Sequence, residues 1–270
     1  MKATPTYPRR VMSILNVTPD SFFAASRANH TTELRGAVER MVAEGADIID
    51  IGGYSTRPGA TDVAVQEEIG RVLRGVEVAR ERAPQMTLSI DTFRSEVAEA
   101  VLSRYDNIII NDITGGLGDE RMASMVAYYD APMVVMHSRG TPQTMQSLTH
   151  YDNVTEQVRE ELARRAEWLT GQGVEKIILD PGIGFAKDVE QNYELLGGLE
   201  RIASLGYELL VGISRKSFIY RPLGITPEEA LEATTALHWA SLERGAHILR
   251  VHDTLAARQT ITLFEKLNKL

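Results

Sequence analysis

The feature that most constrains the fold of this 270-residue chain is a repeat of eight short apolar runs, each of which stops at a polar residue or a glycine. The stops are Asn16, Gly52, Asp91, Asn111, His137, Asp180, Ser214 and His252. Between successive runs the sequence is amphipathic and long enough to form a helix. This alternation is typical of parallel βαβ units, and eight of them can close into an α/β barrel. We therefore expect a single eight-stranded parallel barrel of the TIM type that occupies residues 1–270 as one domain.

The expected strands are short and strongly apolar, which suits strands that are covered on both faces. Their expected ranges are 11–15, 47–51, 87–90, 108–110, 132–136, 176–179, 208–211 and 247–251. The connections after the first, second and fifth strands are longer than ordinary; the first covers 16–30 and the third 138–151. Long ordered loops in a compact domain usually bind or cover a ligand. Mobile surface insertions are the alternative interpretation.

Composition limits the classes of function. A formal net charge of −8 disfavours a nucleic-acid partner, which would need a basic surface. The absence of cysteine excludes disulfides, thiolate nucleophiles and cysteine metal sites, and it fits a reducing cytoplasm. Residues 1–10 do not resemble a signal peptide, and no apolar stretch is long enough to span a bilayer. We therefore expect a cytoplasmic protein with neither a nucleic-acid nor a membrane partner.

Basic residues gather at the ends of the last two expected strands, where barrels commonly bind phosphate. The segments are Ser214-Arg215-Lys216-Ser217 and Arg250-Val251-His252. Together with Arg57 and Arg139 they predict a cationic rim that would draw anions into the mouth of the barrel. The alternative is that these side chains form structural ion pairs.

Acidic and amide side chains end three other strands. Asp91, Asn111 and Asp180 suit a flat heterocycle with several N–H donors, such as an aminopyrimidine edge. They could equally bind a hard cation such as magnesium, or cap the following helices. Capping is a serious alternative for Asp91, which is followed by Thr-Phe-Arg-Ser. For the lone His137, a structural role is favoured over that of a catalytic base.

Read together, the strand ends carry eight motifs in a fixed order. They are ILNVTPDSF (14–22), STRPGA (55–60), SIDT (89–92), NDITGG (111–116), RGTPQTMQ (139–146), ILDPGIGF (178–185), SRKSFI (214–219) and RVHD (250–253). This set resembles the dihydropteroate synthase family of pterin-binding barrels over essentially the whole chain. The resemblance implies the condensation of 6-hydroxymethyl-7,8-dihydropterin diphosphate with 4-aminobenzoate to 7,8-dihydropteroate and diphosphate, in folate biosynthesis. It also implies Mg²⁺ as a cofactor and a homodimer.

The resemblance also implies a role for individual residues. The pterin pocket would consist of Asp91, Asn111, Asp180, Lys216 and Arg250. The diphosphate would be bound by Asn16, Arg250 and His252, with the magnesium ion near Asn16. The 4-aminobenzoate site maps onto Thr56, Arg57, Pro58, Phe185 and Ser217, next to Lys216. The residues expected to carry the chemistry are Asp91, Lys216, Arg250 and His252.

Elementary chemistry agrees with this assignment. Diphosphate leaves easily only if its growing charge is stabilised, which an arginine, a histidine and magnesium would do. Positive charge then builds on the exocyclic carbon, and a buried carboxylate, with Asp91 the best candidate, would stabilise it. The aromatic amine attacks next, so the enzyme needs no nucleophile of its own. Closure of the first two long loops would exclude water.

Several positions depart from the family pattern. Residues 23–26 read Phe-Ala-Ala-Ser where Ser-Asp-Gly-Gly is usual, so Ala24 replaces the loop aspartate. Tyr54, Ser138 and Ala186 replace a frequent glutamate, methionine and glycine. None of these belongs to the expected pterin set. Two rival functions stay open: a methyltransferase that uses methyltetrahydrofolate and a corrinoid, against which the TPDSF, STRPG and RVH motifs argue, and a non-catalytic pterin-binding barrel, which only the altered first loop supports.

Overall fold

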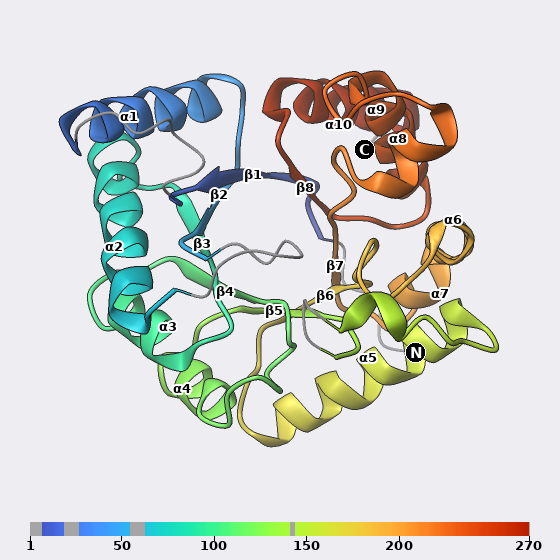
Figure 1. The fold of residues 1–270 in the computed structure, drawn as a ribbon, viewed down its shortest axis with the longest axis horizontal. Coiled ribbons are helices and arrows are strands. Elements are labelled where there is room, and N and C mark those ends of the chain that lie inside the picture. The colour runs from blue at the N-terminus through green and yellow to red at the C-terminus, as the bar shows by residue number, and fades with distance from the viewer. Residues whose placement is uncertain (1–6, 19–26, 55–62, 141–143, 270) are drawn as a thin grey trace.

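Eight parallel strands form a closed barrel, in which each strand pairs with the next along the chain and β8 pairs with β1 (Figure 1). This computed structural model describes residues 7–18, 27–54, 63–140 and 144–269. The strands are β1 (Arg10–Asn16), β2 (Ile48–Gly52), β3 (Thr87–Asp91), β4 (Ile108–Asp112), β5 (Met133–Met136), β6 (Ile177–Asp180), β7 (Glu208–Val211) and β8 (Ile248–Val251). The predicted TIM-type α/β barrel is confirmed. That residues 1–270 form a single domain stays a prediction.

Helices surround the ring of strands, as Figure 1 shows. They are α1 (Arg27–Ala43), α2 (Val65–Arg82), α3 (Ser95–Leu102), α4 (Met122–Tyr128), α5 (Val154–Gly171), α6 (Val189–Gly197), α7 (Leu199–Ala203), α8 (Ser217–Leu223), α9 (Leu231–Glu243) and α10 (Thr254–Asn268). In α5, Asn153 caps the first turn by accepting the N–H of Glu156, and Val158, Leu162 and Leu169 bury one face. Among the described residues, none of these helices has the length and apolar character that a membrane crossing requires.

A single apolar layer fills the middle of the barrel. Its members are Met12, Ile48, Ile109, Val134, Ile178, Leu210 and Ile248. Side chains two positions apart in a strand point the same way, so the next inward layer is fixed by the sequence. That layer consists of Ile14, Asp50, Asn111, Met136, Asp180, Gly212 and Arg250. The interior therefore changes from apolar to polar within one layer, at the end of the barrel where the strands end.

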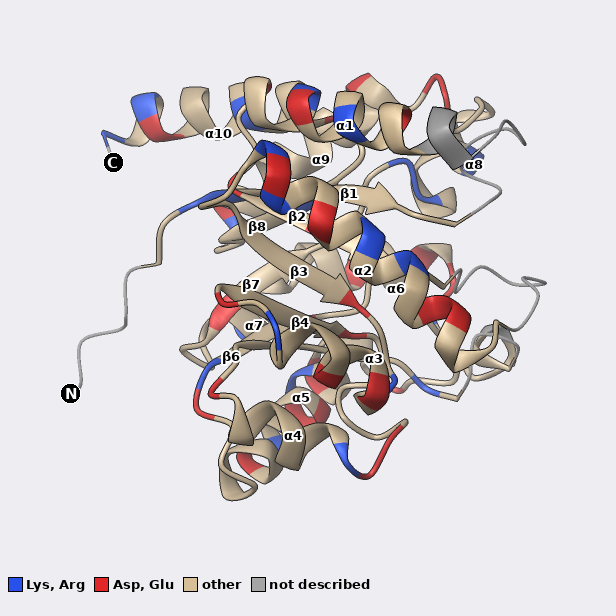
Figure 2. Cartoon of the chain, turned by 90° about the vertical axis from the view of Figure 1, so that its left-hand side faces the viewer, with Lys and Arg blue, Asp and Glu red and all other residues tan. Residues whose placement is uncertain are grey.

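The side view in Figure 2 shows the same change. The strands are largely tan, whereas charged residues colour the outer helices and some strand ends. The carboxyl end of β3 is red, where the apolar strand reaches Asp91. In β3 the charge thus lies at the mouth, at the carboxyl end of an otherwise uncharged strand.

Element boundaries differ from the predicted ones in several places. The predicted strand 208–211 coincides with β7. By contrast, β1 includes Asn16, because that residue still pairs with Gly52, and β4 continues through Asn111 to Asp112. Helix α1 begins at Arg27, within the segment 16–30 that the sequence predicts as a loop. The connection after β5 contains a short 3₁₀ helix, Met145–Ser147. Residues 19–26, 55–62 and 141–143 of the three long loops lie outside the described residues.

Candidate active site

The centre of the polar layer is an ion-pair cluster in which Arg250 of β8 bridges two carboxylates. Its Nε donates to Oδ2 of Asp50 at 2.7 Å, and its Nη2 donates to Oδ2 of Asp91 at 2.7 Å. Asp50 is fully buried, whereas Arg250 and Asp91 keep 23% and 18% of their side chains exposed. One guanidinium therefore faces two carboxyl groups, and the cluster carries excess negative charge when both are ionised.

Asp50 is a site residue that the sequence-based prediction missed. It lies within β2, two positions beyond Ile48 of the apolar layer. The signal is present in the sequence, since Asp50 is the one charged residue in the run Ile-Ile-Asp-Ile. The ends of the apolar runs, taken alone, do not reveal it.

Because two carboxyl groups share one guanidinium, the pKa of Asp91 depends on both neighbours. Burial raises the pKa of Asp91 to about 7; the charge of Arg250 opposes this rise, and the neighbouring Asp50 adds to it. Burial disfavours the charged form of Arg250, but Asp50 and Asp91 outweigh it and raise the pKa of the guanidinium. Asp91 therefore changes its protonation near neutral pH, while Arg250 stays charged.

Polar residues form one row across the first four strands. The backbone register pairs Asn16 with Gly52, Gly52 with Asp91, and Asp91 with Asn111. A Cβ added to Gly52 would lie 3.6 Å from Cβ of Asp91 and 3.9 Å from Oδ1 of Asn16. The glycine therefore keeps a space between these two side chains. Asn111 donates its Nδ2 to the carboxylate of Asp50 at 3.3 Å, which turns the Asn111 oxygen into the acceptor for a ligand.

Asp180 ends β6 and lies at the same end of the barrel as Arg250. Its Oδ1 accepts the N–H of Gly182 at 2.8 Å. Burial raises the pKa of Asp180, against the opposing charges of Lys216 and Arg250 and the Gly182 hydrogen bond. Burial also lowers the pKa of Lys216 to about 8, and the charge of Asp180 opposes this. Acidic and basic side chains from distant segments therefore act on one another across a single mouth.

Lys216 lies along the loop that follows β6. Its Nζ is 4.7 Å from the centroid of the Phe185 ring and donates to the carbonyl of Ile183. A Cβ on Gly184 would lie only 2.9 Å from Cδ of Lys216, so a larger residue there would push the lysine stem aside. The structure thus brings together Phe185, Lys216 and, at the first position of α8, Ser217. Thr56, Arg57 and Pro58, the other residues predicted for 4-aminobenzoate, lie outside the described residues.

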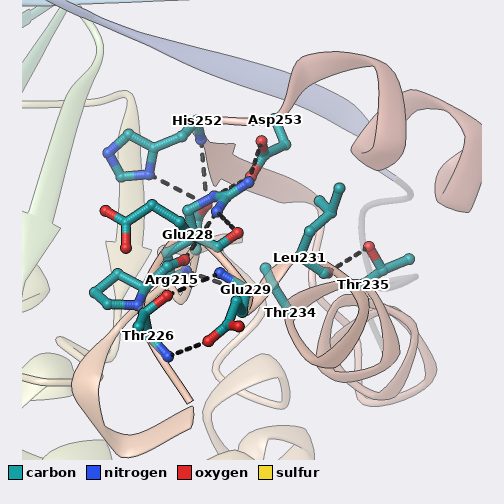
Figure 3. Close-up of polar contacts among 11 residues, drawn as sticks. Arg215, Thr226, Glu228, Glu229, Leu231, Thr234, Thr235, His252 and Asp253 are labelled. Atoms are coloured by element: carbon teal, nitrogen blue, oxygen red, sulfur yellow. Dashed lines mark hydrogen bonds and ion pairs between the residues drawn. The ribbon is translucent and has the colours of Figure 1, made fainter. Parts of the chain in front are cut away.

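His252 follows β8 and contacts Ser214 of the preceding loop. The Nδ1 of His252 lies 3.2 Å from Oγ of Ser214, and the same hydroxyl accepts the backbone N–H of His252 at 3.3 Å. Figure 3 shows this contact beside the side chain of Arg215. The loops after β7 and β8 are therefore joined at the rim.

The predicted cationic rim is wrong for two of its members. Arg215 donates to both carboxylate oxygens of Asp253, at 2.7 and 2.9 Å, and to the carbonyls of Pro227 and Glu228 (Figure 3). Arg139 pairs with Glu161, and its guanidinium lies 3.9 Å from the ring of Tyr151. Both arginines form structural ion pairs instead of facing the mouth as unpaired cations. Arg57 lies outside the described residues.

The surroundings of Asp91 and His137 distinguish between structural and functional roles for these two residues. Asp91 does not cap α3: the N–H of Ser95 at the start of that helix donates to Oδ2 of Asp119 at 2.7 Å. His137 is buried, with Nε2 3.0 Å from Glu161 and Nδ1 3.1 Å from Lys187. Because both ring nitrogens of His137 have partners inside the protein, the structural role favoured for this residue agrees with its surroundings.

Known proteins resemble this chain over nearly its whole length. Residues 12–252 match the family model described as pterin binding enzyme. The chain is 41% identical over 261 residues to the dihydropteroate synthase of Streptococcus pyogenes serotype M6. This alignment covers 95% of each of the two chains. It is 42% identical over 251 residues to the folic acid synthesis protein fol1 of Schizosaccharomyces pombe, covering 90% of this chain but only 34% of that longer protein.

Solved structures agree with this match. The dihydropteroate synthase of Xanthomonas albilineans with 4-aminobenzoic acid superimposes with a TM-score of 0.89 at 35% identity, covering 97% of this chain and 94% of that one. The dihydropteroate synthase of Clostridium difficile, solved in the presence of pteroic acid, gives 0.90 at 36% identity and covers 100% of both. The barrel and the match over residues 12–252 therefore define a pterin-binding enzyme. Within that class, the chain belongs to the dihydropteroate synthase family.

Proposed function

We propose that this chain acts as a cytoplasmic homodimer that condenses 6-hydroxymethyl-7,8-dihydropterin diphosphate with 4-aminobenzoate, forming 7,8-dihydropteroate and diphosphate. The observation that carries the proposal is the cluster in which Arg250 bridges Asp50 and Asp91, beside Asn111 and Asp180. This cluster places hydrogen-bond acceptors for the pterin ring beside the guanidinium of Arg250, which would bind the leaving diphosphate. The solved relatives with 4-aminobenzoic acid and in the presence of pteroic acid support both halves of the substrate pair.

The pterin would bind through its edges. The carboxylate of Asp180 and the side-chain oxygen of Asn111 would accept the N–H groups of the aminopyrimidine edge, and Lys216 would donate to the ring carbonyl. Asp91 would face the dihydropyrazine side, with Arg250 against the ring. Buried acceptors left without partners would penalise a ligand that lacks these N–H groups, which gives the pocket its selectivity.

In the first chemical step, the bond between the exocyclic carbon and the diphosphate oxygen breaks, and its electron pair leaves with the diphosphate. Arg250, His252 and Asn16 would stabilise the departing negative charge. Ionised Asp91 would stabilise the positive charge that develops on the exocyclic carbon and the ring. Because Asp50 and Asp91 already fix the guanidinium of Arg250, its orientation is set before the substrate arrives.

In the second step, the amine nitrogen of 4-aminobenzoate forms a bond to the exocyclic carbon and then loses a proton. An aryl ammonium is a strong acid, so little help from a base is needed. Phe185 and Ser217, together with residues 56–58, would hold this substrate. Its carboxylate would lie near Ser217 at the start of α8, where backbone N–H groups favour an anion.

The residues at the mouth fit a magnesium ion of the kind that is held mainly by substrate. Within the described ranges, no three His, Asp or Glu side chains are grouped so as to hold a metal by themselves. Mg²⁺ usually takes one or two protein oxygens and completes its shell with phosphates and water. The Oδ1 of Asn16, next to the space above Gly52, would be such an oxygen. When bound, the ion would neutralise part of the charge on the leaving diphosphate.

The direct test is to measure dihydropteroate formed from the two substrates in the presence of Mg²⁺, with and without a sulfonamide. Product that depends on both substrates is the expected result. Asp180→Asn should lose most of its affinity for the pterin substrate because a donor would replace an acceptor. Pterin binding without product at every Mg²⁺ concentration would instead favour the non-catalytic barrel.

The homodimer is supported by apolar side chains exposed on one helix. Leu255, Leu263 and Leu267 of α10 are 49%, 63% and 70% exposed. Large exposed apolar side chains on one helix are candidates for a contact with another protein chain. Sedimentation velocity should show a dimer that Leu263→Glu weakens, whereas Leu117→Glu, at an exposed position before α4, should not change the assembly. A wild-type monomer at micromolar concentration would contradict this part of the proposal.

A further inference from the structure

Lys187 is a buried lysine that the proposed reaction does not use. It lies between β6 and α6 and is 4% exposed. An ammonium group buried in this way is costly unless all its N–H groups have partners. The Nζ of Lys187 has three: the carbonyls of Gly182 at 3.0 Å and Phe185 at 2.9 Å, and Nδ1 of His137 at 3.1 Å. Three acceptors match the three donors of a protonated lysine.

This arrangement fixes the proton on His137. To accept from Lys187, Nδ1 of His137 must be unprotonated, so the ring proton lies on Nε2 and is donated to Glu161 at 3.0 Å. Burial lowers the pKa of His137 to about 4, which agrees with a neutral ring at neutral pH. Glu161 in turn pairs with Arg139. A continuous chain of polar contacts thus connects the loop after β5 with the loop after β6.

Burial also lowers the pKa of Lys187, to about 7. The charges of Asp180 and Glu161 oppose this change, whereas Lys216 and Arg139 add to it. Two of these groups, Asp180 and Lys216, belong to the mouth of the barrel. Lys187 is therefore close enough to the site for its hydrogen bonds to affect the residues that bind substrate.

The two carbonyls that Lys187 binds stand at the two ends of the turn 182–185. Gly182 and Gly184 have φ angles of +65° and +88°, a left-handed conformation that glycine adopts easily. The stem of Lys216 lies over Gly184, and its ammonium lies 4.7 Å from the Phe185 ring centroid. Lys216 thus packs against the same turn whose two end carbonyls accept hydrogen bonds from Lys187.

We propose that Lys187 is a positioning residue: by binding both ends of the turn 182–185, it places the Phe185 ring and the Lys216 ammonium for the two substrates. This inference rests on the proposed function and adds to it a residue that does not contact substrate. Loss of the Lys187 ammonium would remove this donor from the Phe185 carbonyl and leave the Gly182 carbonyl with only the backbone N–H of Phe185, at 3.0 Å, so the turn could shift. Displacements of about 1 Å at a reacting centre can cost on the order of 100-fold in rate.

The test compares Lys187→Met with the wild type. Methionine keeps most of the side-chain volume but removes the ammonium. We expect a higher KM for 4-aminobenzoate, a lower kcat, and a loss in kcat/KM on the order of 100-fold. A lysine with only a structural role would lower Tm and leave both constants unchanged. Wild-type kinetic constants in a folded Lys187→Met protein would therefore overturn the proposal.

Lys176→Met is the matched control. The Nζ of Lys176 donates to the carbonyl and the carboxylate of Asp130, at 3.0 and 2.6 Å, and this lysine directly precedes β6, at the end of the strand away from the mouth. Its loss should leave KM and kcat unchanged. If Lys187→Met does not fold, Lys187→Gln, which keeps two N–H donors, replaces it: a kcat/KM below that of the wild type is expected, and wild-type kinetic constants in the folded variant would overturn the proposal.

A second measurement needs no variant and no activity. The ¹⁵N NMR spectrum of the wild-type protein should show His137 in the Nε2–H form at neutral pH. The Nδ1–H form would overturn the hydrogen bond from Lys187 and with it the proposal. If the wild type makes no dihydropteroate, the proposed function fails, while the protonation of His137 still decides whether Lys187 holds the turn as inferred.

Discussion

Arg215 and Asp253 form a bidentate ion pair, with Nε and Nη2 of the arginine donating to the two carboxylate oxygens at 2.7 and 2.9 Å (Figure 3). Arg215 stands between Ser214 and Lys216, and Asp253 directly follows His252. The backbone of Arg215 has φ +55°, which is uncommon for a residue with a side chain. The pair therefore holds together the two loops that carry Lys216 and His252.

We expect Arg215→Lys to impair catalysis as well as stability. A lysine has no planar fork, so it cannot bind both oxygens of Asp253 and two carbonyls at once. The loss of unfolding free energy should be about 1–3 kcal/mol, and kcat/KM should fall by roughly 10- to 100-fold as Lys216 and His252 lose their support. Steady-state kinetics and chemical denaturation measure the two effects separately.

Arg10→Lys is the control for this prediction. Arg10 binds both carboxylate oxygens of Glu208 at 2.7 Å, at the starts of β1 and β7, and has an exposure similar to that of Arg215. Its replacement should reduce stability with little change in kcat/KM. If both variants lose the same fraction of activity, the Arg215–Asp253 pair acts only through global stability.

Asp91→Asn should lose turnover and gain stability at neutral and alkaline pH. The pKa of Asp91 is raised in the folded state to about 7, whereas in the unfolded chain the carboxyl ionises near its ordinary pKa of about 4. The wild type therefore loses stability as the pH rises from about 4 to about 7, and this loss is complete above that range. An amide does not titrate, so the stability of the variant should not fall over this pH range and should exceed that of the wild type at pH 8. Denaturation experiments should show this gain shrinking with falling pH and vanishing near about pH 4.

The kinetic counterpart of this prediction is an acidic limb in the pH profile. If ionised Asp91 stabilises the developing cation, kcat/KM of the wild type should rise as the pH increases through about 7. Asp91→Asn should have a low rate without that limb. A wild-type profile that stays flat between about pH 5.5 and 8 would show that the charge of Asp91 is not needed.

The barrel and the composition of its mouth could be predicted because both follow from local rules. The apolar runs fix the strands, and the alternation of side chains fixes which residues point inward. For this reason Asn16, Asp91 and Asn111 lie in one row, as the register shows. The roles of these residues in binding and catalysis stay predictions until they are measured.

The pairing of long charged side chains could not be predicted in the same way. Arg215 lies 38 residues before its partner Asp253, and Arg139 lies 22 residues before Glu161. Nothing in the local sequence indicates that these carboxylates lie within reach, so the sequence predicts both arginines at the rim. Lys187 was missed for the same reason, because its partners become visible only when the turn 182–185 is folded.

Gly52→Ala tests the space between Asn16 and Asp91. The added methyl would make ordinary contacts with both side chains, at 3.9 and 3.6 Å, so stability should stay within about 1 kcal/mol of the wild type. The methyl would nevertheless occupy the gap where the diphosphate and its ion are proposed to bind. We expect KM for the pterin substrate to rise roughly tenfold. Gly70→Ala, in α2 with no atom within 4 Å of the new methyl, should leave KM unchanged.

Acid sensitivity of the fold should depend in part on His238, in α9. It is 3% exposed, its Nε2 has no hydrogen-bond partner among the described residues, and burial lowers its pKa to about 4, against the charge of Asp253. In the unfolded chain this histidine is therefore protonated below about pH 6.5, whereas in the folded protein it stays neutral down to about pH 4. As the pH falls through this range, the free energy of unfolding decreases by up to about 1.4 kcal/mol per pH unit. His238→Leu should reduce this slope in denaturation experiments between about pH 6 and 4.5. An unchanged slope in His238→Leu would mean that His238 is already protonated in the folded protein.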